Sequence, residues 1–271
     1  MAVPTVHRVR AHNAAIESEN KIHDDEVAQR FGFRGGLVPG VTVYAYMTHP
    51  VVTMFGRAWL ERGTMTARFH QPFYEGDTVI VSATAVEPAT LELTATNDAG
   101  AVCASGRASL PAAPAPTDRP DPAAYPAAPP PDDRPPATPE ALATLDVLGS
   151  LESGFHADLA HGFLGQLDED LALYDRDGLA HPGWLLRAAN DILGANVRLG
   201  PWIHTASTMT NLGVVRDGDR VATRARVAGL STRKGHELVE LDVLLLVNGD
   251  RPVTHIRHSA IYRLREPGPA T

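Results

Sequence analysis

The segment ENKIHDDEVAQRFGFRGGLVPG, residues 19–40, decides how the rest of the chain is interpreted. It combines an asparagine, a histidine and several acidic side chains, and it then passes through glycines to a Pro39-Gly40 pair. Proline is well tolerated in the first turn of a helix, because the amide there has no partner within the helix. The segment therefore predicts a polar, ionisable loop that leads directly into a helix beginning near Gly40.

The same order of landmarks occurs twice in the chain. The shared landmarks are helix-opening turns at 36–40 and 178–183, Gly-Asp turns at 76–77 and 218–219, and strand-joining turns at 97–100 and 248–250. The interval from the helix-opening glycine to the Gly-Asp turn agrees to within one residue between the two halves. Repeated landmarks in a fixed order indicate an internal duplication. We therefore expect two related α+β modules.

Each expected module has one apolar helix among alternating strands. The apolar positions at helical spacing are Val41, Tyr44, Ala45 and Met47 in the first half, and Trp184, Leu185, Ala188, Ala189, Ile192 and Leu193 in the second. Pro50 is expected to interrupt or kink the first helix. Alternating runs such as 79–85 and 239–245 predict antiparallel strands, so we expect a sheet wrapped around each helix.

A segment rich in proline, alanine and aspartate separates the two halves. It covers residues 111–139, and its composition lacks backbone donors and apolar anchors. Such composition predicts an extended, semi-rigid linker over the surface rather than a helix or an inner strand. The expected modules are then residues 1–110 and 140–271.

The bulk composition excludes several classes of protein. With 271 residues, 44% of them hydrophobic, the chain is large enough to bury a core, and its net charge of −8 disfavours a nucleic-acid or anionic-membrane surface. The single cysteine, Cys103, rules out an intrachain disulfide and is expected to be a buried thiol in a reducing compartment. The first ten residues lack an apolar core of signal-peptide length, and LDVLLLV at 241–247 is too short to span a bilayer. We expect a cytoplasmic protein without a membrane segment.

The loop and helix start resemble a known enzyme family. Residues 20–25 read N-x-x-H-x-D and residues 36–40 read G-x-x-x-G, as in the MaoC-like hot-dog family of (R)-specific enoyl-CoA hydratases and dehydratases. The matching positions are Asn20, His23, Asp25 and Gly40. Three positions differ: Ser18 stands where the family carries its catalytic aspartate, Lys21 replaces a proline, and Pro39 replaces a histidine.

The resemblance implies a double hot-dog fold and chemistry on 2-enoyl or 3-hydroxyacyl thioesters. It implies that His23 is the acid and base, that Asn20 orients it, and that the Gly40 amide stabilises the thioester oxygen. Because Ser18 is a poor base at neutral pH, Glu19 or Glu17 is the candidate replacement carboxylate. The acyl group would arrive on coenzyme A or a carrier protein, with no metal and no redox cofactor required.

Other residues of the loop are candidate substrate contacts. Lys21 and Arg34 could meet a phosphate of coenzyme A, although scattered basic residues on a loop are more often solvated. The remaining candidates are Asp25, Gly36 and Val38. Structural roles stay open as well, since Asn20 is also suited to a turn and Asp24 to the cap of a short helix.

The second half offers an alternative site. His181 stands before Pro182-Gly183 at the position where the family carries a histidine, and Asp191 lies on the following helix, where some hot-dog thioesterases carry an acid. The simpler interpretation places Asn190 and Asp191 on the polar edge of an amphipathic helix, and makes His204 a packed strand residue.

Three functions therefore stay open: a hydratase or dehydratase, a thioesterase, and a non-catalytic acyl-binding module. The sequence contains no G-x-G-x-x-G, no H-E-x-x-H and no G-x-S-x-G, which disfavours nucleotide, zinc and serine-esterase sites. The duplicated chain is expected to act as a monomeric pseudo-dimer or as a homodimer.

Overall fold

A computed structural model describes residues 5–112 and 119–266 of the chain. The first half contains β1 (Thr5–Arg10), η1 (Lys21–His23), α1 (Asp25–Arg30), α2 (Gly40–Phe55), α3 (Arg57–Arg62), β2 (Thr64–Phe69), β3 (Thr78–Glu87), β4 (Thr90–Thr96) and β5 (Val102–Ser109). The second half contains η2 (Pro122–Ala124), α4 (Pro139–Ala143), β6 (Leu151–Gly154), α5 (Ala157–Gln166), α6 (Leu173–Arg176), α7 (Pro182–Asn196), β7 (Ile203–Asn211), β8 (Arg220–Arg233), β9 (His236–Val247) and β10 (Arg251–Arg263).

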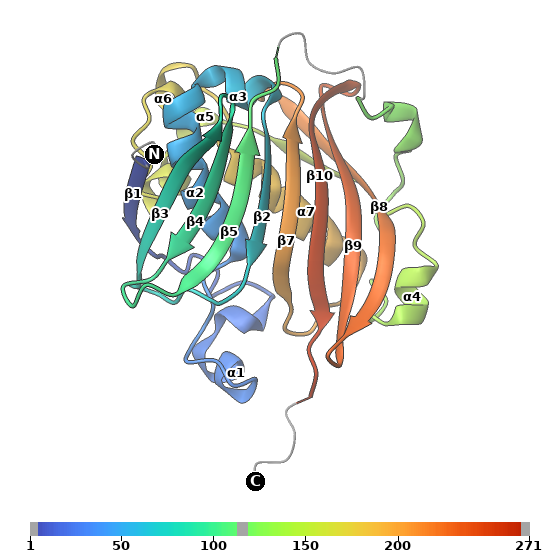
Figure 1. Cartoon of the computed structure of the whole chain (residues 1–271). Coiled ribbons are helices and arrows are strands. Elements are labelled where there is room, and N and C mark those ends of the chain that lie inside the picture. Colours follow the sequence, from blue (N-terminus) through green and yellow to red (C-terminus); the bar gives the residue numbers. More distant parts are fainter. Residues whose placement is uncertain (1–4, 113–118, 267–271) are drawn as a thin grey trace.

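All the strands of the described ranges belong to one antiparallel sheet. Its order is β1-β3-β4-β5-β2-β7-β10-β9-β8-β6, so the strands of the first half form one side and those of the second half the other (Figure 1). The two halves join where β2 pairs with β7, with Thr64 opposite Thr210 and Ala67 opposite Ser207. The sheet is therefore continuous across the duplication, with one edge strand from each half.

The two long helices, α2 and α7, lie against the same face of this sheet (Figure 1). Each begins at its expected Pro-Gly, with Pro39 as the cap of α2 and Pro182 in the first turn of α7. Two modules, each a sheet wrapped around one helix, make up a double hot-dog fold. The fold expected from the sequence is confirmed.

Pro50 does not interrupt α2, so the expectation that the helix would end there is wrong. The helix continues from Gly40 to Phe55 through the proline. An interior proline costs about 3 kcal/mol. Burial of a large apolar side chain returns about 1.5–3 kcal/mol, and Met47 and Val51 beside Pro50 are both buried. Packing between the sheet and α7 thus outweighs the local penalty.

The two Gly-Asp turns and the burial of Cys103 agree with the predictions from the sequence. Gly76 and Gly218 adopt φ of +78° and +82°, a left-handed conformation that glycine tolerates best, so both Gly-Asp turns form as expected. Cys103 is buried. No helix in residues 5–112 or 119–266 combines the length and apolar character needed to cross a membrane.

The linker is anchored to the outer face of the sheet. Tyr125 is buried against Leu244 and Leu246 of β9, and its hydroxyl donates to Asp242 Oδ1 at 2.8 Å. The expectation of a segment without apolar anchors or helical turns is wrong here, because this aromatic ring follows the short turn η2 and covers an apolar patch. Residues 113–118 of the linker lie outside the described residues.

Candidate active site

Local capping folds the loop before α2 into a compact shape. Asn20 caps η1, with Oδ1 accepting from the Ile22 amide at 3.3 Å, and Asp24 caps α1, with Oδ1 accepting from the Val27 amide at 3.0 Å. Asp25 Oδ1 accepts from the Gly36 amide at 2.7 Å, which draws the glycine turn back onto η1. The loop is therefore held by its own acids, and Asp25 has a structural contact in place of the substrate contact considered for it.

His23 is fixed in one orientation and one tautomer. Its Nδ1 lies 2.6 Å from the Leu37 carbonyl oxygen, which can only accept, so Nδ1 carries the proton. Its Nε2 lies 3.3 Å from the Asn20 side-chain nitrogen, which donates, so Nε2 is unprotonated. Burial lowers the pKa of the His23 imidazole. The neutral ring thus has an unprotonated Nε2, the form a general base needs, and its lone pair accepts the long 3.3 Å hydrogen bond from Asn20 until a water proton replaces it.

Asn20 clamps this loop to the second half of the chain. Its Oδ1 accepts from the Trp202 amide at 3.1 Å and its Nδ2 donates to the Trp202 carbonyl at 3.0 Å. These two backbone partners also decide which end of the Asn20 amide faces His23, because the nitrogen must be the donor. The predicted orienting role of Asn20 thus has a geometric basis in both modules.

The start of α2 is crowded by a residue of the second half. A Cβ added to Gly40 would lie 2.7 Å from His204 Nδ1. The Thr42 and Val43 amides both bond to the Pro39 carbonyl, and the Gly40 and Val41 amides precede the first possible intrahelical donor. Glycine is therefore needed at this position for close approach, and the residue that approaches is an imidazole.

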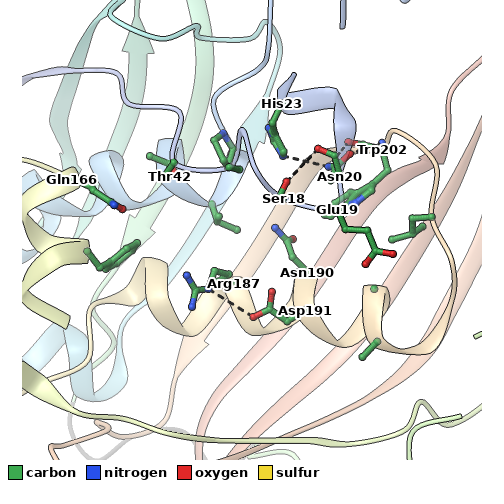
Figure 2. A pocket seen from close by; sticks show the side chains of 18 of the residues that line it. Ser18, Glu19, Asn20, His23, Thr42, Gln166, Arg187, Asn190, Asp191 and Trp202 are labelled. Carbon is green, nitrogen blue, oxygen red and sulfur yellow. Dashed lines mark hydrogen bonds and ion pairs between the residues drawn. The ribbon is translucent and has the colours of Figure 1, made fainter. Parts of the chain in front are cut away.

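Two cavities meet at His23. One has a volume of about 570 Å³ and the other about 220 Å³, and they share the lining residues Asn20, His23, Pro39, Asn190 and Trp202. The larger cavity has a polar wall that includes Thr42, Gln166, Arg187 and Asp191 (Figure 2). The smaller is mostly apolar and contains Gly40, with walls from Phe33, Leu37, Val38, Val43, Phe69, Phe73, Ile203 and Ile261. A bipartite ligand would pass His23 at the junction.

Helix α7 supplies the opposite wall. Figure 2 shows Asn190 directed from α7 toward the loop that carries Asn20 and His23, with Arg187 and Asp191 beside it. Asn190 Oδ1 is buried without a hydrogen-bond partner. Asp191 is 55% exposed and lies 3.7 Å from Arg187, and partial burial raises the pKa of its carboxyl. The polar helix edge expected here faces the larger cavity.

The candidate replacement carboxylate is engaged elsewhere. Glu19 forms two hydrogen bonds to Arg134, at 2.8 and 3.0 Å, and the hydrogen bond from Arg134 lowers the Glu19 pKa. Ser18 Oγ donates to the Asn20 carbonyl at 3.3 Å. Both Ser18 and Glu19 line the larger cavity, while Glu17 is exposed and lies outside it.

The other predicted substrate contacts separate into two groups. Val38 lines the smaller cavity, and Gly36 is buried against the His23 carbonyl, where a side chain would not fit. Lys21 and Arg34 line neither cavity. The Arg34 guanidinium contacts Asp77 at 2.6 Å and stacks 4.2 Å above the Tyr74 ring, so it is occupied within the protein.

His181, the alternative candidate, caps α7. Its Nδ1 accepts from the Gly183 amide at 3.0 Å, and its Nε2 lies 3.5 Å from Glu169. The ring is fully enclosed, and burial lowers its pKa. His181 lines neither of the two cavities, whereas Asp191 of the same alternative lines the larger.

Sequence reasoning did not single out His204, Trp202 or Asn190 as site residues. His204 was expected as a packed strand residue, and it is indeed buried on β7, but it also lines the smaller cavity beside Gly40. No motif marks it, because its place depends on the pairing of β7 with β2.

Comparison with known proteins supports the fold. No family model matches the chain, and no curated protein matches it in sequence. Among solved structures, a conserved hypothetical protein of Mycobacterium tuberculosis with a double hotdog fold is similar, with a TM-score of 0.65, 17% identity and 96% coverage of both chains.

Two further solved structures are similar in fold. A candidate MaoC domain protein dehydratase of Chloroflexus aurantiacus gives a TM-score of 0.61 at 11% identity, covering 97% of this chain and 96% of its own. A candidate thioesterase II of Thermobifida fusca gives 0.52 at 16% identity, with 94% and 91% covered. These similarities establish the double hot-dog fold.

Proposed function

We propose that this double hot-dog chain is a MaoC-like hydratase or dehydratase acting on 2-enoyl or 3-hydroxyacyl thioesters. The observation that carries the proposal is the unprotonated Nε2 of His23 at the junction of two cavities, one of which contains the Gly40 start of α2. A fixed base near unpaired helix amides is the arrangement that this chemistry needs. The MaoC-like dehydratase among the similar folds is consistent with it.

In the proposed hydration, His23 takes one proton from water and later gives it to the α-carbon of the substrate. His23 Nε2 removes a proton from water while the water oxygen bonds to the β-carbon of the enoyl group. The electron pair of the double bond moves toward the thioester, and the negative charge on its oxygen is stabilised by the amides at the start of α2, beginning with Gly40. The imidazolium then returns the proton to the α-carbon. Dehydration is the same sequence reversed.

The chemistry of the cavities suggests how the substrate lies. The smaller, apolar cavity suits the acyl chain, and the larger cavity, with its amides and charged side chains, suits the pantetheine arm. Such an arm is present in both coenzyme A and carrier proteins. The thioester would then lie between the two, beside His23.

The direct test is hydration of crotonyl-CoA, followed by loss of the enoyl absorbance. Wild-type protein should turn the substrate over, and His23→Gln should reduce kcat by about 10²–10⁴-fold, the usual contribution of a general base. His161→Gln is the matched control, because His161 is exposed on α5 and lines neither cavity. Equal activity of the wild type and His23→Gln would refute the proposal.

A thioesterase is the second candidate, favoured by the Asp191 carboxylate in the wall of the larger cavity. Release of free thiol from a saturated acyl-CoA, abolished in Asp191→Asn, would support it. Binding of both ligands with neither reaction would instead support the non-catalytic acyl-binding module.

A further inference from the structure

A second group of polar side chains lies behind the start of α2, within the sheet. His204 and Ser207 of β7 and His258 of β10 are all buried, with exposed fractions of 6%, 3% and 1%. Ser207 Oγ lies 2.8 Å from His204 Nε2 and 3.1 Å from His258 Nδ1, so the hydroxyl links the two imidazoles. Neither imidazole takes part in the steps assigned to His23.

The hydroxyl makes this chain of hydrogen bonds directional. Ser207 has a single proton, so it donates to one imidazole and accepts from the other. If it donates to His204 Nε2, the neutral His204 carries its proton on Nδ1. If it donates to His258 Nδ1 instead, the His204 proton lies on Nε2 and Nδ1 is bare.

The free end of the chain lies at Gly40. His204 Nδ1 is buried and has no hydrogen-bond partner among residues 5–112 and 119–266, and it is the atom that lies 2.7 Å from the Cβ that Gly40 lacks. His204 lines the smaller cavity together with His23 and Gly40, and the Phe69 ring packs edge-on against it with centroids 4.7 Å apart. A buried polar atom without a partner at a ligand cavity is a place where a ligand atom can complete the bonding.

The loop supplies only one acid-base group to the proposed reaction. Ser18 occupies the position of the catalytic aspartate, and Glu19 is paired with Arg134. The base in the loop is therefore a single imidazole. A further fixed donor beside the helix start would compensate by stabilising the charge that develops on the thioester oxygen.

Resting on the proposed function, we infer that His204 is a second catalytic residue, whose Nδ1–H donates to the thioester oxygen beside the Gly40 amide. This role requires the first of the two arrangements, in which Ser207 accepts from His258 Nδ1 and donates to His204 Nε2, so Ser207 and His258 act as positioning residues that keep the His204 proton on Nδ1. The Nδ1 proton is not transferred; it stabilises the enolate by a hydrogen bond while His23 moves the reacting proton.

The burial of His204 and His258 is compatible with a hydrogen-bond donor role for His204. Desolvation is the main factor that lowers the pKa of His204 far below its ordinary value, and the neighbouring His258 adds to it. Desolvation also lowers the pKa of His258, to about 3. Both rings are therefore neutral at neutral pH, and a neutral imidazole donates a hydrogen bond without becoming an acid that competes with His23.

The kinetic test compares two substitutions of His204 in crotonyl-CoA hydration. His204→Phe keeps an aromatic ring and removes the donor, so kcat should fall by about 10²–10³-fold with KM within about threefold. His204→Asn places a side-chain amide where Nδ1 was and should recover at least tenfold of that loss, which a purely structural role does not predict. His161→Gln, at an exposed position of α5 that lines neither cavity, should keep the wild-type kcat.

A second measurement does not depend on the variants folding. Two-bond ¹H–¹⁵N spectra of histidine-labelled wild-type protein identify the protonated nitrogen of each neutral ring. His204 should show a proton on Nδ1, and saturation with butyryl-CoA, which carries the thioester but cannot react, should shift that proton downfield. A proton on Nε2 in both states would overturn the inference.

The outcomes separate the two proposals. An active wild type whose His204→Phe variant keeps its kcat refutes the role of His204 and leaves the hydratase intact. A wild type that turns over no enoyl thioester refutes the hydratase, and the donor role of His204 with it.

Discussion

Replacement of Gly40 by alanine probes the closest contact between the two modules at the candidate site. The added Cβ would lie 2.7 Å from His204 Nδ1, 3.0 Å from its Cγ and 3.1 Å from its Cβ. Ordinary contact begins near 3.4 Å, so the helix start or the imidazole must move by about 0.7 Å. Both lie in a packed wall of the smaller cavity, so neither can move without disturbing the site.

The expected losses of folding stability and of activity in Gly40→Ala follow from that displacement. Overpacking of a core typically costs 1–3 kcal/mol, and alanine returns about 1 kcal/mol through its helix propensity, which leaves a net loss of up to about 2 kcal/mol. For a chain of this size that lowers the Tm by up to about 8 °C. Displacement of the Gly40 amide by a large fraction of an ångström should lower kcat by roughly 10–100-fold.

Gly183, the equivalent glycine of α7, provides the matched control. A Cβ there would lie 2.7 Å from the Ala45 Cβ and 3.3 Å from both His181 Nδ1 and Phe163 Cζ. The crowding is similar, but Gly183 lines neither cavity at His23. Thermal unfolding of both variants and crotonyl-CoA hydration are the assays. The two Tm shifts should agree within a few degrees while only Gly40→Ala loses activity. Equal losses of activity, or none in either variant, would refute the reasoning.

Three further predictions concern the surroundings of the site. Burial lowers the His258 pKa to about 3 from an unfolded value of 6.5. Below pH 6.5 the His258 side chain of the unfolded protein therefore binds a proton, whereas in the folded protein it stays neutral. His258 alone should reduce the free energy of unfolding by about 2 kcal/mol from pH 7.5 to 5, in addition to the loss from the other buried histidines, and urea unfolding of His258→Gln should lack that part. Asn20→Ala leaves both backbone groups of Trp202 without their partner, so it should lower the free energy of unfolding by about 2–3 kcal/mol and also lower kcat. Unchanged values of both would contradict the role of Asn20 in holding the loop to Trp202. Asp25→Ala removes the acceptor of the Gly36 amide and should lower the free energy of unfolding, measured in urea, by about 1–2 kcal/mol. Its crotonyl-CoA activity should be largely kept. An unaltered unfolding midpoint would show the contact to be dispensable.

The outcomes of the sequence predictions differ with the range of the interactions involved. The helix starts at Gly40 and Pro182, the Gly-Asp turns and the cap at Asp24 all formed as predicted, because each depends on residues a few positions apart. The expectation at Pro50 was wrong because a helix enclosed by a sheet and a second helix gains more from packing than it loses at the proline.

The sequence by itself determined the duplicated module, its apolar helix and strands, and the loop that holds Asn20 and His23. These follow from local propensity and from a repeated pattern of apolar residues. Only the tertiary structure decided which residues meet that loop. Asn20 binds Trp202 at a separation of 182 residues, and the contact of Gly40 with His204 exists because β2 and β7 pair antiparallel at the centre of one sheet. Contacts with the Leu37 carbonyl and the Asn20 amide then set the tautomer of His23, and burial favours its neutral form; no linear pattern encodes these surroundings.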